Sequence, residues 1–576
     1  MLLSNLRVLV AAPDGVARLR ALILTLAVQG KLVAQDPNDE PASALLKKIR
    51  AEKDRLTTVG KLKRHQPLAK TTDDQPPFGL PVGWAWSNLA TIGIINPKNE
   101  VPDETLASFV QMSSIPVAFS EVHDAEPRPW SDIKCGFTQF ADGDIGVAKI
   151  TPCFENAKST VFQGLTNGIG AGTTELHIVR PLGGIAPRYV LLFVKNPAFL
   201  QGGEAVMTGC AGQKRVPRGY FESKPFPLPP LAEQSRIVTR VEELMRLCDA
   251  IEAKGQLDVA RHAQLVAALL GTLTHCETPE HLSASWQRIA THFDLLLDRP
   301  QAVDALEQTM LQLAVSGQLV PQDPHDEPAS ALLKKVRLEK DRLVTMGQIK
   351  RDKRLPPIEK NEQPFALPLG WAWVRLRDVV SHLGDGLHGT PNFAPNGNCY
   401  FVNGNNLGAG VITIKPETRR IDVAEYERYK KPLDTRSVLV SINGTLGRVA
   451  LYRGEQIILG KSVCYFNVTS GLEKMYARLL LECPDFVAYA QTNATGTTIR
   501  NLGLKAMGDW PIALPPLTEQ SRIVARVATL RSLCADLRAR LSASQRAQDR
   551  LAQALVTSVT DRKSTRLNSS HVQPSR

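Results

Sequence analysis

One eleven-residue segment occurs twice, and this duplication constrains the fold more than any other feature. Residues 228–238 read LPPLAEQSRIV, and residues 514–524 read LPPLTEQSRIV. Proline is tolerated at the entrance of a helix but not inside it, so each Pro-Pro pair predicts the end of one domain and the start of a helix. The two copies therefore predict two long helices, each entered from its own domain.

Apolar residues after each Pro-Pro pair recur at alternating steps of four and three. This heptad spacing predicts that each helix packs along its length against another helix. At 1.5 Å per residue, a helix of ~40 residues would form a rod of roughly 60 Å. The predicted coiled-coil seam consists of Ile237, Val241, Leu244, Cys248 and Ile251 in the first helix and Ile523, Val527, Leu530, Cys534, Leu537 and Leu541 in the second.

The duplication extends through the chain. A shift of 287 residues aligns residues 26–56 with 313–343 and Trp84 with Trp371. A period this long predicts two tandem half-proteins rather than a solenoid of short repeats. The parts that match predict two helices in each half, at 14–30 and 41–57 and again at 301–317 and 328–344, each pair followed by a basic, proline-containing linker (58–80 and 345–367).

The parts that differ between the halves span about 84–227 and 371–513. They contain short apolar runs broken by Gly, Asn and Pro, which are typical of β-strands. Helical patterns are few and late, at 187–200 and 473–490. Each part is therefore predicted to be a compact, mostly β, mixed α/β domain.

The charge and the cysteines limit the class of protein. The formal net charge is +12 and the pI is about 9.2, which favours a polyanionic partner such as nucleic acid, although a merely basic surface gives the same value. The nine cysteines are scattered without a Cys-x-x-Cys pair, so neither a disulfide framework nor a zinc site is expected. This use of cysteine fits a reducing cytoplasm. No apolar run of ~18 residues occurs, so we expect no membrane span.

Three segments come close to catalytic motifs. Residues 454–462, GEQIILGKS, have one residue too many for a phosphate-binding loop, and a strand pattern follows instead of a helix. Residues 75–78, QPPF, differ by one residue from the Asn/Asp-Pro-Pro-aromatic motif of amino-methyltransferases. Glu252 and Lys254 have the Glu-x-Lys spacing of nucleases but lie on a predicted helix. Without a nucleophile–base set or metal-ligand spacing, the sequence predicts a recognition scaffold with no catalytic residues, metal or cofactor of its own.

The repeated segments also resemble a known family. The LAV-x-G-x-LV segments, the DEPAS-x-LL segments and both LPPL-x-EQ stops resemble the specificity (S) subunit of Type I restriction–modification systems. Gly143-Asp144 with residues 148–152, and residues 443–447, resemble that family's target-recognition domains. The resemblance covers nearly the whole chain except the polar segment 561–576.

The resemblance implies an α+β fold with two mostly β target-recognition domains in a pseudo-twofold arrangement, separated by a long antiparallel helical coiled coil. It implies that each domain reads one half of a split double-stranded DNA sequence. Two methyltransferase (M) subunits and two restriction (R) subunits would be partners, and S-adenosylmethionine, ATP and Mg would bind those partners. The implied domains are a helical repeat and linker (1–83), target-recognition domain 1 (84–230), the central long helix, second helical repeat and linker (231–370), target-recognition domain 2 (371–516), the C-terminal long helix (517–560) and a disordered tail (561–576).

Candidate DNA contacts are loop residues whose side chains can bind phosphates or base edges. In the first domain they are Lys149, Asn156, Lys158, Gln213, Lys214, Arg215 and Arg218, and in the second they are His388, Asn405, Asn406, Asn443, Thr445, Arg448, Thr498, Arg500 and Lys505.

Two other hypotheses remain open. A stand-alone sequence-specific DNA-binding protein would bind its site without a partner. A self-contained methyltransferase or nuclease would act on DNA by itself and would need a cofactor site that the sequence does not reveal.

Overall fold

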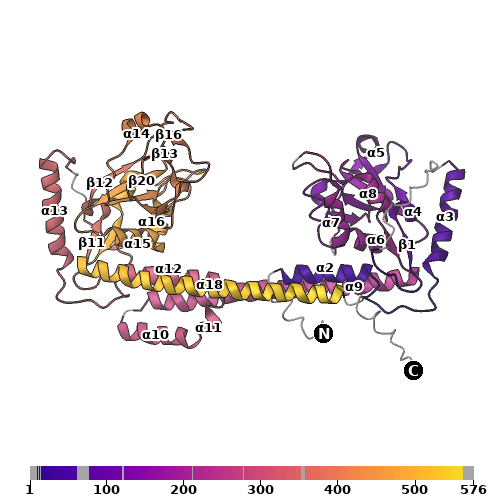
Figure 1. Ribbon diagram of the computed structural model, residues 1–576, viewed down its shortest axis with the longest axis horizontal. Coiled ribbons are helices and arrows are strands. Elements are labelled where there is room, and N and C mark those ends of the chain that lie inside the picture. The colour runs from indigo at the N-terminus through magenta and orange to yellow at the C-terminus, as the bar shows by residue number, and fades with distance from the viewer. Residues whose placement is uncertain are drawn as a thin grey trace, which may run out of the picture. The chain divides into compact units, whose positions relative to one another are not determined.

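The computed structural model describes residues 10, 12, 14–60, 77–119, 122–210, 212–276, 278–351 and 357–561 (Figure 1). The chain divides into two compact units. Unit 1 comprises residues 1–258 and 545–576, and unit 2 comprises residues 259–544. Most of the predicted linker 58–80 and nearly all of the predicted tail 561–576 lie outside the described residues.

Helices form the frame of each unit. The longer helices are α2 (Gly15–Val28), α3 (Ala42–Thr58), α6 (Pro187–Val194), α7 (Pro197–Ala205), α9 (Leu231–Thr274), α10 (Pro279–Thr291), α12 (Pro300–Val315), α13 (Ala329–Thr345), α15 (Lys474–Glu482), α16 (Pro484–Asn493) and α18 (Leu517–Asp561). The shorter ones are α4 (Leu89–Ile92), α5 (Trp130–Ile133), α8 (Arg218–Ser223), α11 (Phe293–Leu296), α14 (Val423–Tyr429) and α17 (Leu504–Asp509), with the 3-10 turns η1 (Met112–Ser114), η2 (Thr166–Gly168), η3 (Lys360–Glu362), η4 (Leu376–Val379) and η5 (Gly404–Asn406). None of the described helices is long and apolar enough to cross a membrane.

The β-domain of unit 1 contains two four-stranded sheets. One has the order β2 (Gly93–Ile95), β9 (Leu176–Pro181), β6 (Ile145–Ala148), β7 (Ser159–Val161), and the other has the order β4 (Glu126–Pro129), β3 (Leu106–Val110), β8 (Ile169–Gly172), β5 (Thr138–Ala141). β3 and β8 are parallel, and the other pairs are antiparallel. β1 (Ala85–Ser87) pairs with β10 (Phe226–Leu228), so the entry and exit of the domain lie side by side.

The β-domain of unit 2 repeats the first of these sheets and three of the four strands of the second. Its first sheet has the order β12 (Val380–Asp385), β20 (Val463–Val468), β17 (Ser437–Ser441), β18 (Val449–Leu451), and its second has the order β16 (Arg420–Ile421), β13 (Cys399–Val402), β19 (Ile457–Leu459), again with one parallel pair. A small ribbon, β14 (Leu407–Gly408) with β15 (Val411–Ile412), is added, and β11 (Ala372–Arg375) pairs with β21 (Pro511–Leu514). The predicted α+β class with two mostly β domains and long helices is confirmed.

Two predicted helices are each split in two. The pattern at 187–200 forms α6 and α7, and the pattern at 473–490 forms α15 and α16. In both cases a proline, Pro197 or Pro484, starts the second helix. Proline disfavours helical geometry in the residue before it, and Asn196 and Cys483 are accordingly extended. The predicted helical pattern of each segment is confirmed, but the proline divides it into two helices.

The seam residues of α9 in unit 1 are only partly those predicted. Ile237, Val241 and Cys248 are buried in a cluster that also contains α2, but Met245 takes the fully buried place predicted for Leu244. Leu244 and Ile251 are half-buried. A helix that packs against several neighbours needs a wider apolar stripe than a two-stranded heptad seam, which explains the added position. Ala552, near the end of α18, is buried in the same cluster.

In unit 2 the seam of α18 packs against helices. Ile523, Val527 and Cys534 are buried. Leu530, Leu537 and Leu541 are half-buried and pack on a cluster with Cys534. The cluster includes the end of α9 (Val266, Leu270 and Leu273) and residues of α12. Thus the last turns of each long helix share a core with an earlier part of the other, as expected for antiparallel helices.

A buried glutamate joins each long helix to its β-domain. In unit 2 Glu519, which is 1% exposed, accepts hydrogen bonds from Trp371 Nε1 at 3.0 Å and from Gln322 Nε2 at 3.2 Å. Burial raises the pKa of Glu519 above its usual value, and the two hydrogen bonds only partly oppose this shift. In unit 1 Glu233 makes the same two bonds, with Trp84 at 2.9 Å and Gln35 at 3.1 Å.

The next residues of the repeated segment extend this junction. Gln520 Oε1 accepts a hydrogen bond from Glu473 N at 2.7 Å, which ties α18 to the start of α15, and Gln234 does the same with Ala186 N at 3.0 Å. Arg522 forms an ion pair with Asp326 at 2.6 Å, and Arg236 forms the matching pair with Asp39. The repeated Glu-Gln-Ser-Arg segment is therefore the joint that fixes helix, loop and domain together.

Replacement of Glu519 by alanine should destabilise unit 2. Trp371 Nε1 would be buried without an acceptor, which costs about 2 kcal/mol. The measurement is urea unfolding followed by tryptophan fluorescence, with Thr529→Ala as control because Thr529 is exposed on the same helix. An unfolding midpoint for Glu519→Ala equal to that of the control would contradict the assigned role.

Candidate functional site

Loops at one edge of the second β-domain gather most of that domain's candidate residues. The segment 442–448 joins β17 to β18, and the segment 495–501 lies between α16 and α17. Gly444 N donates to Arg500 O at 3.1 Å, and Leu502 N donates to Ile442 O at 2.8 Å. The two segments are therefore held together by main-chain bonds, and they bring Asn443, Thr445, Arg448, Thr498 and Arg500 into one region.

Two further loops join this region. Ile442 N donates to Ser462 O at 3.0 Å, and Ser462 Oγ accepts from Gly404 N at 2.9 Å. Leu387 N donates to Leu459 O, which brings the turn with His388 beside the end of β19. We call the segments 386–388, 403–406, 442–448, 460–462 and 495–501 the second loop face. Lys505 is exposed on α17, just after this face.

The second loop face is positively charged. Arg448, Lys461 and Arg500 are exposed, and in the described part of the chain none of them forms an ion pair. His388 is 71% exposed at its side chain, with Nε2 2.6 Å from Asp385 Oδ2. Exposed cations beside Asn and Thr side chains on loops can hold phosphates and offer hydrogen bonds to base edges.

Equivalent loops of the first domain gather its candidates. The segment 149–158 joins β6 to β7, as 442–448 joins β17 to β18, and the segment 208–215 lies between α7 and α8. Thr151 N donates to Lys214 O at 2.9 Å, and Val216 N donates to Lys149 O at 2.8 Å. We call these two segments the first loop face; Asn156, Gln213 and Lys214 are exposed on it.

Several cationic candidates of the first domain are engaged within the chain. Arg215 forms an ion pair with Glu175 at 2.8 Å, which lowers the pKa of Glu175. Lys158 Nζ donates to Met112 O at 2.9 Å, and Arg218 pairs with Glu222 one helical turn away. Lys149, which is half-buried, and Lys214 form no ion pair among the residues described for this domain.

The prediction that Asn406 contacts DNA is wrong. Its side chain is 4% exposed. Oδ1 accepts from Asn403 N at 3.0 Å, and Nδ2 donates to Thr413 O and Thr418 Oγ1, each at 3.0 Å. Asn406 thus holds the turn that presents its exposed neighbour Asn405, and the sequence Gly-Asn-Asn gives no sign of which amide points inward.

Lys461 was missed as a candidate contact. It lies in the Gly-Lys-Ser turn between β19 and β20, which resembles part of a phosphate-binding loop. Residues 463–468 form a strand, as predicted, so no helix N-terminus follows the turn. A Lys at the tip of a turn between two strand patterns was the signal that could have identified it.

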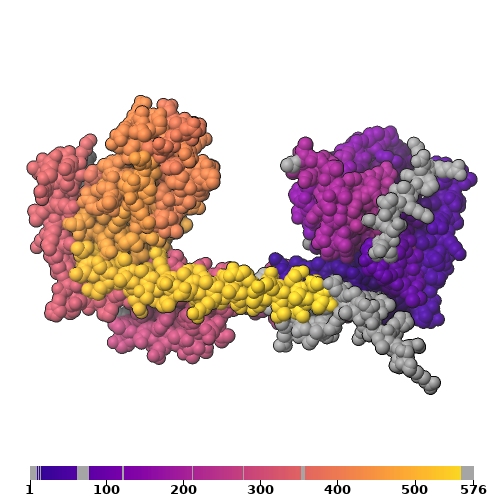
Figure 2. All heavy atoms as spheres, in the orientation of Figure 1, coloured from indigo at the N-terminus to yellow at the C-terminus, as the bar shows by residue number. Residues whose placement is uncertain are grey.

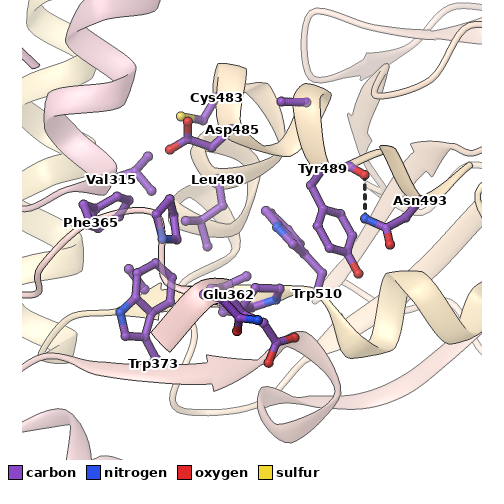
Figure 3. Close-up of a pocket in the computed structure, with 16 residues that line it drawn as sticks. Val315, Glu362, Phe365, Trp373, Leu480, Cys483, Asp485, Tyr489, Asn493 and Trp510 are labelled. Atoms are coloured by element: carbon purple, nitrogen blue, oxygen red, sulfur yellow. Dashed lines mark hydrogen bonds between the residues drawn. The ribbon is translucent and has the colours of Figure 1, made fainter. Parts of the chain in front are cut away.

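A cavity of about 430 Å³ in unit 2 is lined mainly by aromatic and other apolar side chains (Figure 3). Phe365, Trp373 and Trp510 line it, together with Cys483 and Asp485. Burial raises the pKa of Cys483 to about 12, so its thiolate is scarce at neutral pH, and burial also raises the pKa of Asp485. No base lies in hydrogen-bond contact with the thiol of Cys483 among the described residues.

Side chains of the other two near-catalytic segments contact other parts of the fold. Glu252 of the Glu-x-Lys spacing forms an ion pair with Arg20 at 2.7 Å. Within the described residues, no three His, Cys, Asp or Glu side chains are grouped so that they could hold a metal ion. Phe78 packs edge-on against Trp86, whereas residues 75 and 76 of the QPPF segment lie outside the described residues.

Comparisons with known proteins agree with these features. Residues 368–544 match the family described as the Type I restriction modification DNA specificity domain. The specificity subunit of the type I restriction enzyme EcoEI of Escherichia coli is 42% identical over 553 residues, which cover 94% of this chain and 93% of that protein. The EcoAI specificity subunit, also of Escherichia coli, is 42% identical over 552 residues with the same coverage.

A solved chain from a study of complex assembly and conformational transition in the type I R-M system aligns with 84% of this chain and 99% of its own length. The sequence identity is 18% and the TM-score is 0.46. The identity and coverage shared with the two Escherichia coli proteins are decisive for the family. The chain belongs to the specificity subunits of type I restriction enzymes.

Proposed function

We propose that the chain is a non-catalytic subunit whose two β-domains each read one half of a bipartite DNA sequence. The observation that carries this proposal is the pair of loop faces. They stand at equivalent positions of two domains that share strand order but little sequence. Equivalent positions suit two equivalent tasks on the duplex, and unlike side chains suit two unlike half-sites.

The long helices would set the distance between the half-sites. α9 begins in unit 1 and ends in unit 2, and α18 begins in unit 2 and ends in unit 1. Helices that pass from one unit to the other are suited to hold two reading domains about one turn of DNA (~34 Å) apart, with an unread spacer between the half-sites.

Catalysis would come from partner subunits. We propose two methyltransferase subunits, because two like repeats suit two copies of one partner. Two restriction subunits would complete the nuclease. S-adenosylmethionine, ATP and Mg would then bind these partners rather than this chain. The alternative, a stand-alone DNA-binding protein, would bind its site with full affinity when no partner is present.

Exchange of residues 87–227 for the corresponding domain of another family member should change one half of the recognised sequence. The exchange is feasible because β1 and β10 pair at the domain boundary and bring the two junctions together. Mapping of methylated adenines in cells that carry the hybrid and its partner subunits gives the result. A change in both half-sites would disprove the assignment of one half-site to each domain.

The Arg448→Ala variant should weaken DNA binding, whereas Arg453→Ala should not. Arg448 precedes β18 on the second loop face, and Arg453 follows the same strand at its other end; both are exposed. Loss of one base contact costs about 1–3 kcal/mol, and loss of one phosphate contact reduces the salt dependence of binding by about one unit. Affinity of the assembled complex would be measured over a range of salt concentrations. Equal effects of the two variants would exclude the second loop face as a DNA contact.

Insertion of seven residues after Leu257 in α9, with a matching seven after Ser544 in α18, should lengthen the spacer. These positions adjoin the boundaries of the two units. Two helical turns add about 10 Å, or about three base pairs. Both half-sites should be retained in the methylation map, separated by the longer spacer. Methylation at the original spacing would contradict the role of the helices as a ruler.

A further inference from the structure

Helices α3 and α13 are matching arms that each pack on the β-domain of their own unit. The buried side of α3 consists of Ala42, Leu45 and Ile49, and the buried side of α13 consists of Ala329, Leu332 and Val336. Contact is close, because a Cβ on Gly183 would lie 2.6 Å from Ile49 Cγ1, and one on Gly471 would lie 2.4 Å from Val336 Cγ2.

Polar contacts also fasten each arm. Glu52 accepts a hydrogen bond from Gly183 N at 3.2 Å, and Glu339 accepts one from Ser470 N at 3.0 Å. Lys53 donates to Ala90 O, and Lys340 donates to Arg377 O. Burial lowers the pKa of Lys53 to about 8. Each arm is therefore a fixed part of its unit with one free side, and Figure 2 shows α13 exposed beside the second domain.

The exposed sides of the two arms are nearly identical in sequence. Eight positions are exposed on each helix, and only Ala51, which corresponds to Leu338, differs. The seven identical pairs are Ser43/Ser330, Lys47/Lys334, Lys48/Lys335, Arg50/Arg337, Asp54/Asp341, Arg55/Arg342 and Thr58/Thr345. The exposed side is thus as well matched as the buried side, where Ile49 corresponds to Val336.

Other exposed positions of the repeats have diverged. On the long helices Glu243 corresponds to Thr529, Arg246 to Ser532 and Asp249 to Ala535, and all six are exposed. On the first repeat helices Ala17 corresponds to Asp304. Duplication alone therefore does not account for the identity of the arms.

Internal contacts account for only part of it. Lys48 pairs with Glu40 and Lys335 with Glu327, the Thr58 and Thr345 hydroxyls donate to the carbonyls of Asp54 and Asp341, and the Asp341 carboxylate lies 3.7 Å from Arg351. Lys47, Arg50, Lys334 and Arg337, in contrast, form no ion pair or side-chain hydrogen bond within the described part of the chain. Side chains that form no ion pair or hydrogen bond among the described residues and yet match in both copies indicate a common external partner.

We propose that the exposed sides of α3 and α13 are two equivalent docking surfaces for an acidic surface of a partner protein, one copy on each arm. This inference rests on the proposed function, in which two methyltransferase subunits bind. Each surface presents four cations and one carboxylate, so an acidic partner surface complements it. DNA phosphates fit less well. They bind Lys and Arg alike, so they would not require the same cation at each matched position, and they would repel Asp54 and Asp341.

The test is assembly of the full chain with its methyltransferase subunit, measured by native mass spectrometry. The variants are Lys47→Glu/Arg50→Glu on α3, Lys334→Glu/Arg337→Glu on α13, and the combination of both. We expect two copies on the unmodified chain, one copy on each single-arm variant and none on the combination. Like charges in an interface should weaken binding to the altered arm at least about tenfold.

Controls separate the possible failures. Arg428→Glu/Arg453→Glu makes the same charge change at exposed positions of the second domain and should keep two copies. The Lys47→Gln/Arg50→Gln variant should unfold at the same temperature as the unmodified chain. This result would show that the fold does not need these charges, so that loss of a copy is not loss of the fold. If the unmodified chain binds no methyltransferase subunit, the proposed function fails. If it binds two and the arm variants also bind two, this inference alone fails, and a loss of DNA affinity in those variants would assign the arms to phosphates.

Discussion

The structure depends on one buried interaction made twice, in which a glutamate near the start of each long helix accepts the indole N–H of a tryptophan at the entrance to the β-domain. Glu233 with Trp84 and Glu519 with Trp371 are buried, and a glutamine from the preceding loop completes each site. A buried carboxylate needs its hydrogen bonds, so helix, loop and domain must meet in one geometry for the site to be satisfied. This requirement explains why the Glu-Gln-Ser-Arg segment is the same in both halves.

The same joint allows the rest of each domain to vary. Strand order is preserved between the two β-domains, yet their loops carry different side chains on frames that meet the long helices in the same way. A chain built like this separates the part that reads a sequence from the part that fixes position. Change in one loop face then leaves the joint, the helices and the arms α3 and α13 unaffected, which suits a subunit that sets the specificity of an enzyme.

Sequence periodicity predicted most of the frame, because the Pro-Pro stops and the four-three spacing are local signals of helix entry and helix packing. It placed α9 and α18 correctly but selected Leu244 where Met245 is buried, since the number of neighbours around a helix is a property of the tertiary structure. The breaks at Pro197 and Pro484 were visible in the sequence and were overlooked. Loop candidates were chosen by residue type alone, which located the right loops but could not distinguish the buried Asn406 from the exposed Asn405.

The central claim is that two unlike reading domains are held at a constant separation. Its most direct test is a map of methylated adenines in the genome that encodes this chain and its partner subunits. The account predicts a single motif made of two unrelated half-sequences with an unread spacer of one constant length. A continuous motif, or half-sequences found at several different spacings, would contradict it.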